Sequence, residues 1–104
     1  MDLGVELANA QAFLEGGKKR VRLYGGLVRH RRIGAAGLAF ALAHETGHHL
    51  GGPPYLQYYR WLSSEERATE WARSVGLHKV FGKASAMRVT ERGLQELRRV
   101  GLLE

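Results

Sequence analysis

A run of small and apolar residues that passes without a break into ionisable ones is the strongest constraint on the fold. Residues 35–43 are alanine, leucine and phenylalanine with one glycine, and His44-Glu45-Thr46-Gly47-His48 follows directly. This pattern predicts a buried helix over Gly34–Leu50, ended by Gly51-Gly52-Pro53-Pro54. Buried imidazoles and carboxylates need partners to offset their lost hydration. The helix must therefore carry a polar site into an apolar interior.

The spacing of the two histidines predicts a zinc site. His44 and His48 are four residues apart, so they share one helix face, with β-carbons about 5–6 Å apart. The chain has no cysteine, which leaves histidine and carboxylates as the strong ligands. Glu45 is too close in sequence to be the next ligand, but it is placed to deprotonate a water that zinc activates. One alternative is that the histidines bind no metal and only interact favourably with the dipole at the C-terminal end of the helix. Another is that the site has lost its metal and remains only as a scaffold.

A catalytic zinc needs a third protein ligand, and the sequence narrows the choice. The longer pattern H-E-x-x-H-x-x-G-x-x-H fits at Gly51, but Pro54 stands where its third histidine is required. The only aspartate is Asp2, far upstream of the motif. The remaining candidates are glutamates of the next predicted helix: Glu65, Glu66 and Glu70.

The two segments 41–48 and 65–72 resemble the gluzincin metallopeptidases, in particular the minigluzincins and the ImmA/IrrE-type enzymes. The second segment is similar to the family pattern E-x-x-A-(D/N)-x-(F/W)-A, which implies that Glu65 is the third zinc ligand. Thr69 replaces the family's Asp or Asn, which commonly bonds a ligand histidine. A shift of one residue would make Glu66 the ligand, but it would misplace the alanine and the tryptophan of the pattern. We also expect Ser63 to cap this helix and Glu66 to complete a capping box, which again leaves Glu65.

The resemblance implies a fold and an activity. The expected fold is α+β: a single zincin-like domain over residues 1–104, with the active-site helix packed under a small antiparallel sheet. The expected activity is zinc-dependent endopeptidase cleavage of a peptide or protein substrate. It further implies latency, if the C-terminal segment Arg98–Glu104 blocks the zinc.

The remaining elements follow from local patterns. Leu3, Leu7, Ala10 and Leu14 fall at helical spacing, so we expect a first helix that Asp2 caps and Gly16-Gly17 closes. A hairpin is expected over Arg20–Ile33, with its turn at Gly25-Gly26. Gly76 is expected to end the glutamate helix. Residues 77–89 are ambiguous, with a short extended piece at 86–89, and Thr90 is expected to cap a last helix that ends at Gly101.

The charge of the chain allows a second function class. Sixteen basic against ten acidic residues give a net charge of +6, which favours acidic partners. Residues 89–103 resemble the closing helix of some winged-helix DNA-binding proteins. The alternative hypothesis is therefore a basic DNA-binding or regulatory module with a structural or vestigial zinc site. No apolar run approaches about 18 residues and the N-terminus does not open on basic residues, so we expect no membrane span and a cytoplasmic protein.

Peptide hydrolysis also requires a donor for the oxyanion. The available side chains are Tyr55, Tyr58, Tyr59 and His78, and the sequence does not rank them. His49 and His78 are expected at the surface, because His49 points about 100° away from His48 on the helix.

Overall fold

The computed structural model describes residues 3–7, 10–25, 29 and 31–99. The side chains of residues 3–7 are not described. The strands are β1 (Leu3–Leu7), β2 (Ala10–Glu15) and β3 (Lys18–Leu23). The helices are α2 (Ala35–Leu50), α3 (Glu65–Trp71), the π-helical turn η1 (Ala72–Gly76), α4 (Leu77–Phe81) and α5 (Lys83–Arg99).

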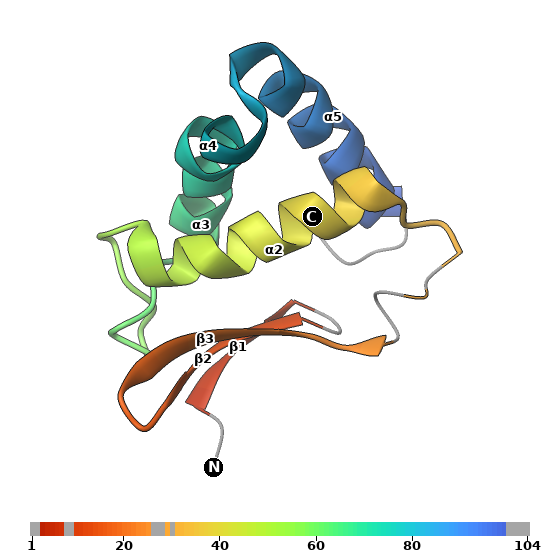
Figure 1. Cartoon of the computed structure of the whole chain (residues 1–104). Coiled ribbons are helices and arrows are strands. Elements are labelled where there is room, and N and C mark those ends of the chain that lie inside the picture. Colours follow the sequence, from red (N-terminus) through yellow and green to blue (C-terminus); the bar gives the residue numbers. More distant parts are fainter. Residues whose placement is uncertain (1–2, 8–9, 26–28, 30, 100–104) are drawn as a thin grey trace.

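Helix α2 is the centre of the molecule. The antiparallel sheet β1-β2-β3 lies along one side of α2, and α3, α4 and α5 lie on the other (Figure 1). Phe40 and Ala41 of α2 are completely buried in a core that also contains Ala10 of β2 and Leu97 of α5. The α+β fold with a helix packed under a small antiparallel sheet is therefore confirmed.

The first predicted helix is wrong, because residues 3–7 form β1 and residues 10–15 form β2. Gly16 and Gly17 have φ angles of +57° and +80°, and Glu15 pairs with Lys18. Two successive residues with positive φ make a tight hairpin turn whose twist matches that of the flanking strands. The two glycines therefore join strands instead of closing a helix. The helical spacing of Leu3, Leu7, Ala10 and Leu14 was overridden by strand pairing.

The hairpin predicted over Arg20–Ile33 is also wrong. Strand β3 pairs along its whole length with the preceding β2, and it ends at Leu23. The carbonyl of Gly25 accepts a hydrogen bond of 2.9 Å from the backbone amide of Arg29, a helical spacing that a two-residue turn at Gly25-Gly26 does not allow. The expected return strand at residues 27–28 lies outside the described residues.

The helix predicted over Gly34–Leu50 is confirmed as α2, but the later helices are longer than expected. The helix that begins at Glu65 runs on through η1 and α4 and stops at Gly82, whose φ is +78°. A methyl group on Gly76 would lie 2.5 Å from the ring of Trp71, so this glycine accommodates an aromatic ring instead of ending the helix. Helix α5 covers most of the ambiguous segment, and Thr90 is a buried mid-helix residue instead of a cap. Gly101 lies outside the described residues.

Two glycines let the other helices approach α2 closely. A methyl group on Gly47 of α2 would lie 2.6 Å from the carbonyl oxygen of Ala68 in α3. A methyl group on Gly93 of α5 would lie 2.6 Å from the carbonyl oxygen of Ala36. The backbones of α3 and α5 thus lie closer to α2 than side chains larger than glycine at these two positions would permit. Within the described chain, no helix has both the length and the apolar character needed to cross a membrane.

Candidate metal centre

His44 and His48 lie side by side in the interior. Both side chains are fully buried, their ring centroids are 4.8 Å apart, and the rings meet edge to face at 88°. Their spacing of one helical turn produces this arrangement, and the preceding apolar turns of α2 hold it inside the core. The prediction that both rings share one helix face is met.

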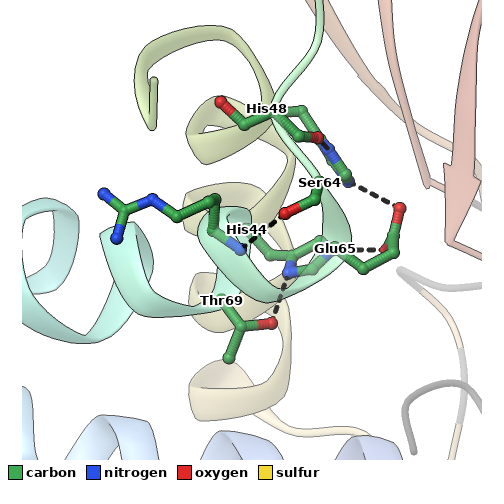
Figure 2. Close-up of polar contacts among 7 residues, drawn as sticks. His44, His48, Ser64, Glu65 and Thr69 are labelled. Atoms are coloured by element: carbon green, nitrogen blue, oxygen red, sulfur yellow. Dashed lines mark hydrogen bonds and ion pairs between the residues drawn. The ribbon is translucent and has the colours of Figure 1, made fainter. Parts of the chain in front are cut away.

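The outer ring nitrogens are held by α3 and by the loop before it. His48 Nδ1 donates to the carbonyl oxygen of Ser63 at 2.7 Å, because a carbonyl can only accept. His44 Nδ1 lies 3.0 Å from the hydroxyl of Thr69 (Figure 2). A proton on Nδ1 leaves Nε2 of a neutral imidazole with its lone pair free. The Glu65 carboxylate can only accept, so His44 Nε2 donates to it at 3.1 Å; with the proton of each ring on Nδ1, both Nε2 atoms would point at a shared cation.

Glu65 completes the group from the first turn of α3. Its Oε1 lies 3.1 Å from His44 Nε2, and its Oε2 lies 3.1 Å from His48 Nε2 (Figure 2). Partial burial alone would raise the pKa of this carboxyl, but the bonds and charges of the two histidines lower it to about 2. The Glu65 side chain is 49% exposed, whereas both histidine rings are fully buried.

These distances fit a metal ion. Ligand bonds of 2.0–2.2 Å in a tetrahedral site separate neighbouring ligand atoms by about 3.4 Å. The separations of 3.1 Å between Glu65 and the two Nε2 atoms are close to that value. The buried His48 Nε2 is near Glu65 but poorly aligned for a hydrogen bond to it, which suits an atom aimed at a shared ion. The buried groups of His44, Glu45 and His48, within 4.8 Å of one another, could also hold a metal ion.

Glu45 is a fully buried carboxylate, and neither of its oxygens makes a well-formed hydrogen bond within the described part of the chain. The backbone amide of Ala12 in β2 lies near enough to lower its pKa, but less than burial raises it. Burial raises its pKa to about 8; the charge of His48 opposes the shift and that of Glu65 adds to it. A carboxyl group with a pKa near neutrality can both take up and release a proton under ordinary conditions.

The raised pKa of Glu45 predicts how the metal-free protein responds to pH. The folded state keeps the proton up to about pH 8, whereas the unfolded chain loses it near 4.5. Glu45 therefore makes its full contribution to the free energy of unfolding below pH 4.5. That contribution falls by a few kcal/mol as the pH rises from about 4.5 to about 8. Urea unfolding of the chelator-treated protein across this range should show the loss. The Glu45→Gln variant should show a smaller loss, and equal pH slopes would contradict the assignment.

The other candidate ligands lie elsewhere. Glu66 is exposed, and no described contact joins it to either histidine. Glu70 faces Arg73 at 3.8 Å. The expected capping box is wrong: Ser64, not Ser63, is the N-cap, and its hydroxyl accepts from the backbone amide of Arg67 at 3.2 Å. The capping argument for Glu65 therefore fails, although Glu65 is the glutamate that contacts both histidines.

The sequence analysis missed the residues that hold the loop and α3 against α2. Ser63 is buried, and its hydroxyl donates to the carbonyl of Gly52 at 2.8 Å while its own carbonyl accepts from His48. Arg67 donates from two guanidinium nitrogens to the carbonyl of Gly51, at 3.2 and 2.9 Å. The end of α2 is thus tied to the helix that carries Glu65. Serines and arginines are common on surfaces, so no pattern in the sequence singled these out.

The close contact at Gly47 gives a prediction for the centre. A Gly47→Ala methyl group would meet the α3 backbone at Ala68, so α3 must move away and take Glu65 with it. We expect a loss of about 1–3 kcal/mol in the free energy of unfolding and weaker metal retention. Urea unfolding and metal content would measure both effects. The control is Gly34→Ala, whose methyl group would have its nearest contact at 3.4 Å; equal effects of the two changes would contradict the prediction.

The remaining candidate residues make no described contact to the centre. Tyr55, Tyr58 and Tyr59 belong to the loop between α2 and α3; Tyr58 is 83% exposed and Tyr59 packs against the ring of Trp61. His78 lies on α4 and is half-buried. His49 is also half-buried, and its Nε2 donates to the carbonyl of Arg20 in β3 at 2.8 Å. The expected surface position is therefore only partly correct for these two histidines.

Comparisons with protein-family models, with curated proteins and with solved structures gave no match to this chain.

Proposed function

We propose that this protein is a small zinc-dependent endopeptidase of the gluzincin type. The observation that carries the proposal is the buried, unpartnered carboxylate of Glu45 beside the converging groups of His44, His48 and Glu65. An unpartnered carboxylate in an apolar interior costs stability, and a catalytic role explains why it is kept.

Zinc is the metal that best suits the donor set. Two imidazole nitrogens and one carboxylate are a common ligand set of catalytic zinc, and they leave one coordination position free. Glu65 is the one member of this donor set whose side chain reaches solvent. The absence of cysteine from the sequence agrees with a nitrogen and oxygen site.

The residues then take distinct roles. A bound zinc ion supplies Lewis acidity, which lowers the pKa of water and polarises a carbonyl group. Glu45 accepts a proton from the attacking water on one of its oxygens and delivers it to the nitrogen that leaves. The hydroxyl of Thr69 and the carbonyl of Ser63 hold the two imidazoles with Nε2 inward.

The gluzincin assignment is supported by the register of α3. Glu65 faces both histidines, Ala68 packs against Gly47, and Thr69 bonds His44. Thr69 therefore makes the contact that the family's Asp or Asn makes. These contacts follow the unshifted alignment, in which Glu65 is the ligand and Glu66 is not.

The test is to measure zinc in protein refolded with and without the metal, together with cleavage of casein. We expect about one zinc per chain and cleavage that a chelator stops and added zinc restores. Zinc without cleavage would contradict the peptidase and favour a regulatory module with a structural site. No zinc would contradict the whole proposal and favour the nucleic-acid alternative.

A further inference from the structure

The basic residues of the chain are concentrated in one segment. Residues 16–43 contain seven basic and no acidic residues, whereas the rest of the chain contains nine basic and all ten acidic ones. The remainder alone would carry a charge of −1, so the whole net charge of +6 originates in this segment. We call its cations the basic surface: Lys18, Lys19, Arg20, Arg22, Arg29, Arg31 and Arg32.

Most of these side chains face solvent. All members of the basic surface are exposed except Arg22, whose guanidinium lies 4.6 Å above the ring of Phe13. Arg20 and Glu15 lie 3.9 Å apart, with both side chains at least half exposed, so this ion pair is weak. Side chains two residues apart on a strand share one face at a spacing of about 6.6 Å, so the cations of Lys18, Arg20 and Arg22 repel one another, and an anionic chain would relieve that repulsion.

Strand β3 lies beside α2, with Leu23 packed on the core and Arg20 and Arg22 on the opposite face of the sheet, next to Phe13 and Gln11. The hydrogen bond from His49 to the carbonyl of Arg20 joins β3 to α2 one residue beyond His48. From there β3 runs along α2 toward the start of that helix (Figure 1). In the described sheet β3 is an edge strand, so one of its long sides has no strand partner.

We propose that the basic surface binds an acidic stretch of the polypeptide on which the metal centre acts. This inference rests on the proposed function, because it takes the substrate to be a polypeptide. An edge strand offers backbone donors and acceptors at the spacing of an extended peptide, in addition to its charges. A nucleic acid would use the charges alone, so the observations favour an acidic polypeptide.

The binding experiment separates this inference from the proposed function. Binding to zinc-loaded Glu45→Gln protein would be measured by fluorescence anisotropy with short labelled peptides. The acidic peptide alternates Glu and Thr, the neutral peptide alternates Ser and Thr, and the basic peptide alternates Lys and Thr. Oligo-dT serves as the nucleic-acid probe. The acidic peptide should bind at least about tenfold more tightly than the neutral one at low ionic strength, and salt should weaken it. Cleavage of the same peptides by the wild type is measured separately. Acidic binding without cleavage would contradict only the peptidase, and cleavage without a preference for acid would contradict only the inference.

Matched charge reversals locate the surface. The double variant Lys19→Glu, Arg31→Glu should weaken acidic-peptide binding about tenfold or more. The control Lys79→Glu, Lys83→Glu changes the net charge equally at exposed positions on α4 and α5, and it should change binding less than about twofold. If the first variant does not fold by circular dichroism, Lys19→Gln, Arg31→Gln replaces it. Equal effects of test and control, or tighter binding of oligo-dT than of the acidic peptide, would overturn the inference.

Discussion

Replacing Glu45 with Gln should lower kcat for peptide hydrolysis by about 10²–10⁴-fold while zinc content stays near one per chain. The amide has nearly the same shape as the carboxylate, but it cannot accept the proton of the attacking water. The backbone amide of Ala12 acts on the Glu45 carboxylate, and the side-chain oxygen of Gln can accept from the same amide, so the change removes no interaction that the fold needs. Retained zinc with lost turnover would therefore isolate the general base.

The control for this variant is Glu66→Gln, the same chemical change at an exposed position. We expect that variant to keep its activity and its zinc. Steady-state cleavage of a quenched fluorescent peptide would give kcat for both proteins. A Glu45→Gln protein that cleaves at the rate of the control would remove Glu45 from the mechanism.

Replacing Glu65 with Gln should weaken zinc binding by at least about a hundredfold. Residues that only orient a ligand typically cost 10–100-fold when changed, and a direct ligand should cost more. The carboxylate lies 3.1 Å from both Nε2 atoms and carries a pKa lowered to about 2, so it is anionic at neutral pH and contributes charge that an amide lacks. Zinc affinity is measured by competition with a coloured chelator.

The same experiment decides between the two adjacent glutamates. Glu66→Gln changes the neighbouring position on α3, which is exposed. Loss of zinc in Glu66→Gln but not in Glu65→Gln would mean that α3 is shifted by one residue, and it would contradict the centre described here. His44→Ala should lose zinc in either case, because both registers use that ligand.

The sequence predicted the elements that depend on neighbouring residues. The buried helix over Gly34–Leu50 followed from its apolar run, and the placement of His44 and His48 on one face followed from helical periodicity. The proximity of Glu65 to both rings agrees with the prediction that came from the resemblance of residues 65–72. These features need only local spacing and a repeated residue pattern.

The errors lie where long-range pairing competes with local pattern. Leu3, Leu7, Ala10 and Leu14 fall at helical spacing, but residues 3–7 and 10–15 form strands because Gly16 and Gly17 turn β2 onto β3. The hairpin turn forms at Gly16-Gly17 and not at Gly25-Gly26. Which pair forms the turn depends on which strands can pair, and pairing is a property of the whole sheet. The N-cap was predicted at Ser63, but the structure has it at Ser64. The sequence cannot distinguish two adjacent serines, because the backbone conformation of the loop decides which one caps the helix.

The sequence by itself determined the chemistry of the candidate centre: two imidazoles and a carboxylate on one buried helix, with no thiol to compete. Only the tertiary structure decided how that chemistry is held. The Gly47 contact sets how near α3 lies, Ser63 and Thr69 hold the two rings, and the backbone of Ala12 in β2 lies against the buried carboxylate of Glu45. The reason is physical: ligand types follow from residue identity, whereas burial and ligand distances depend on which distant backbones pack together.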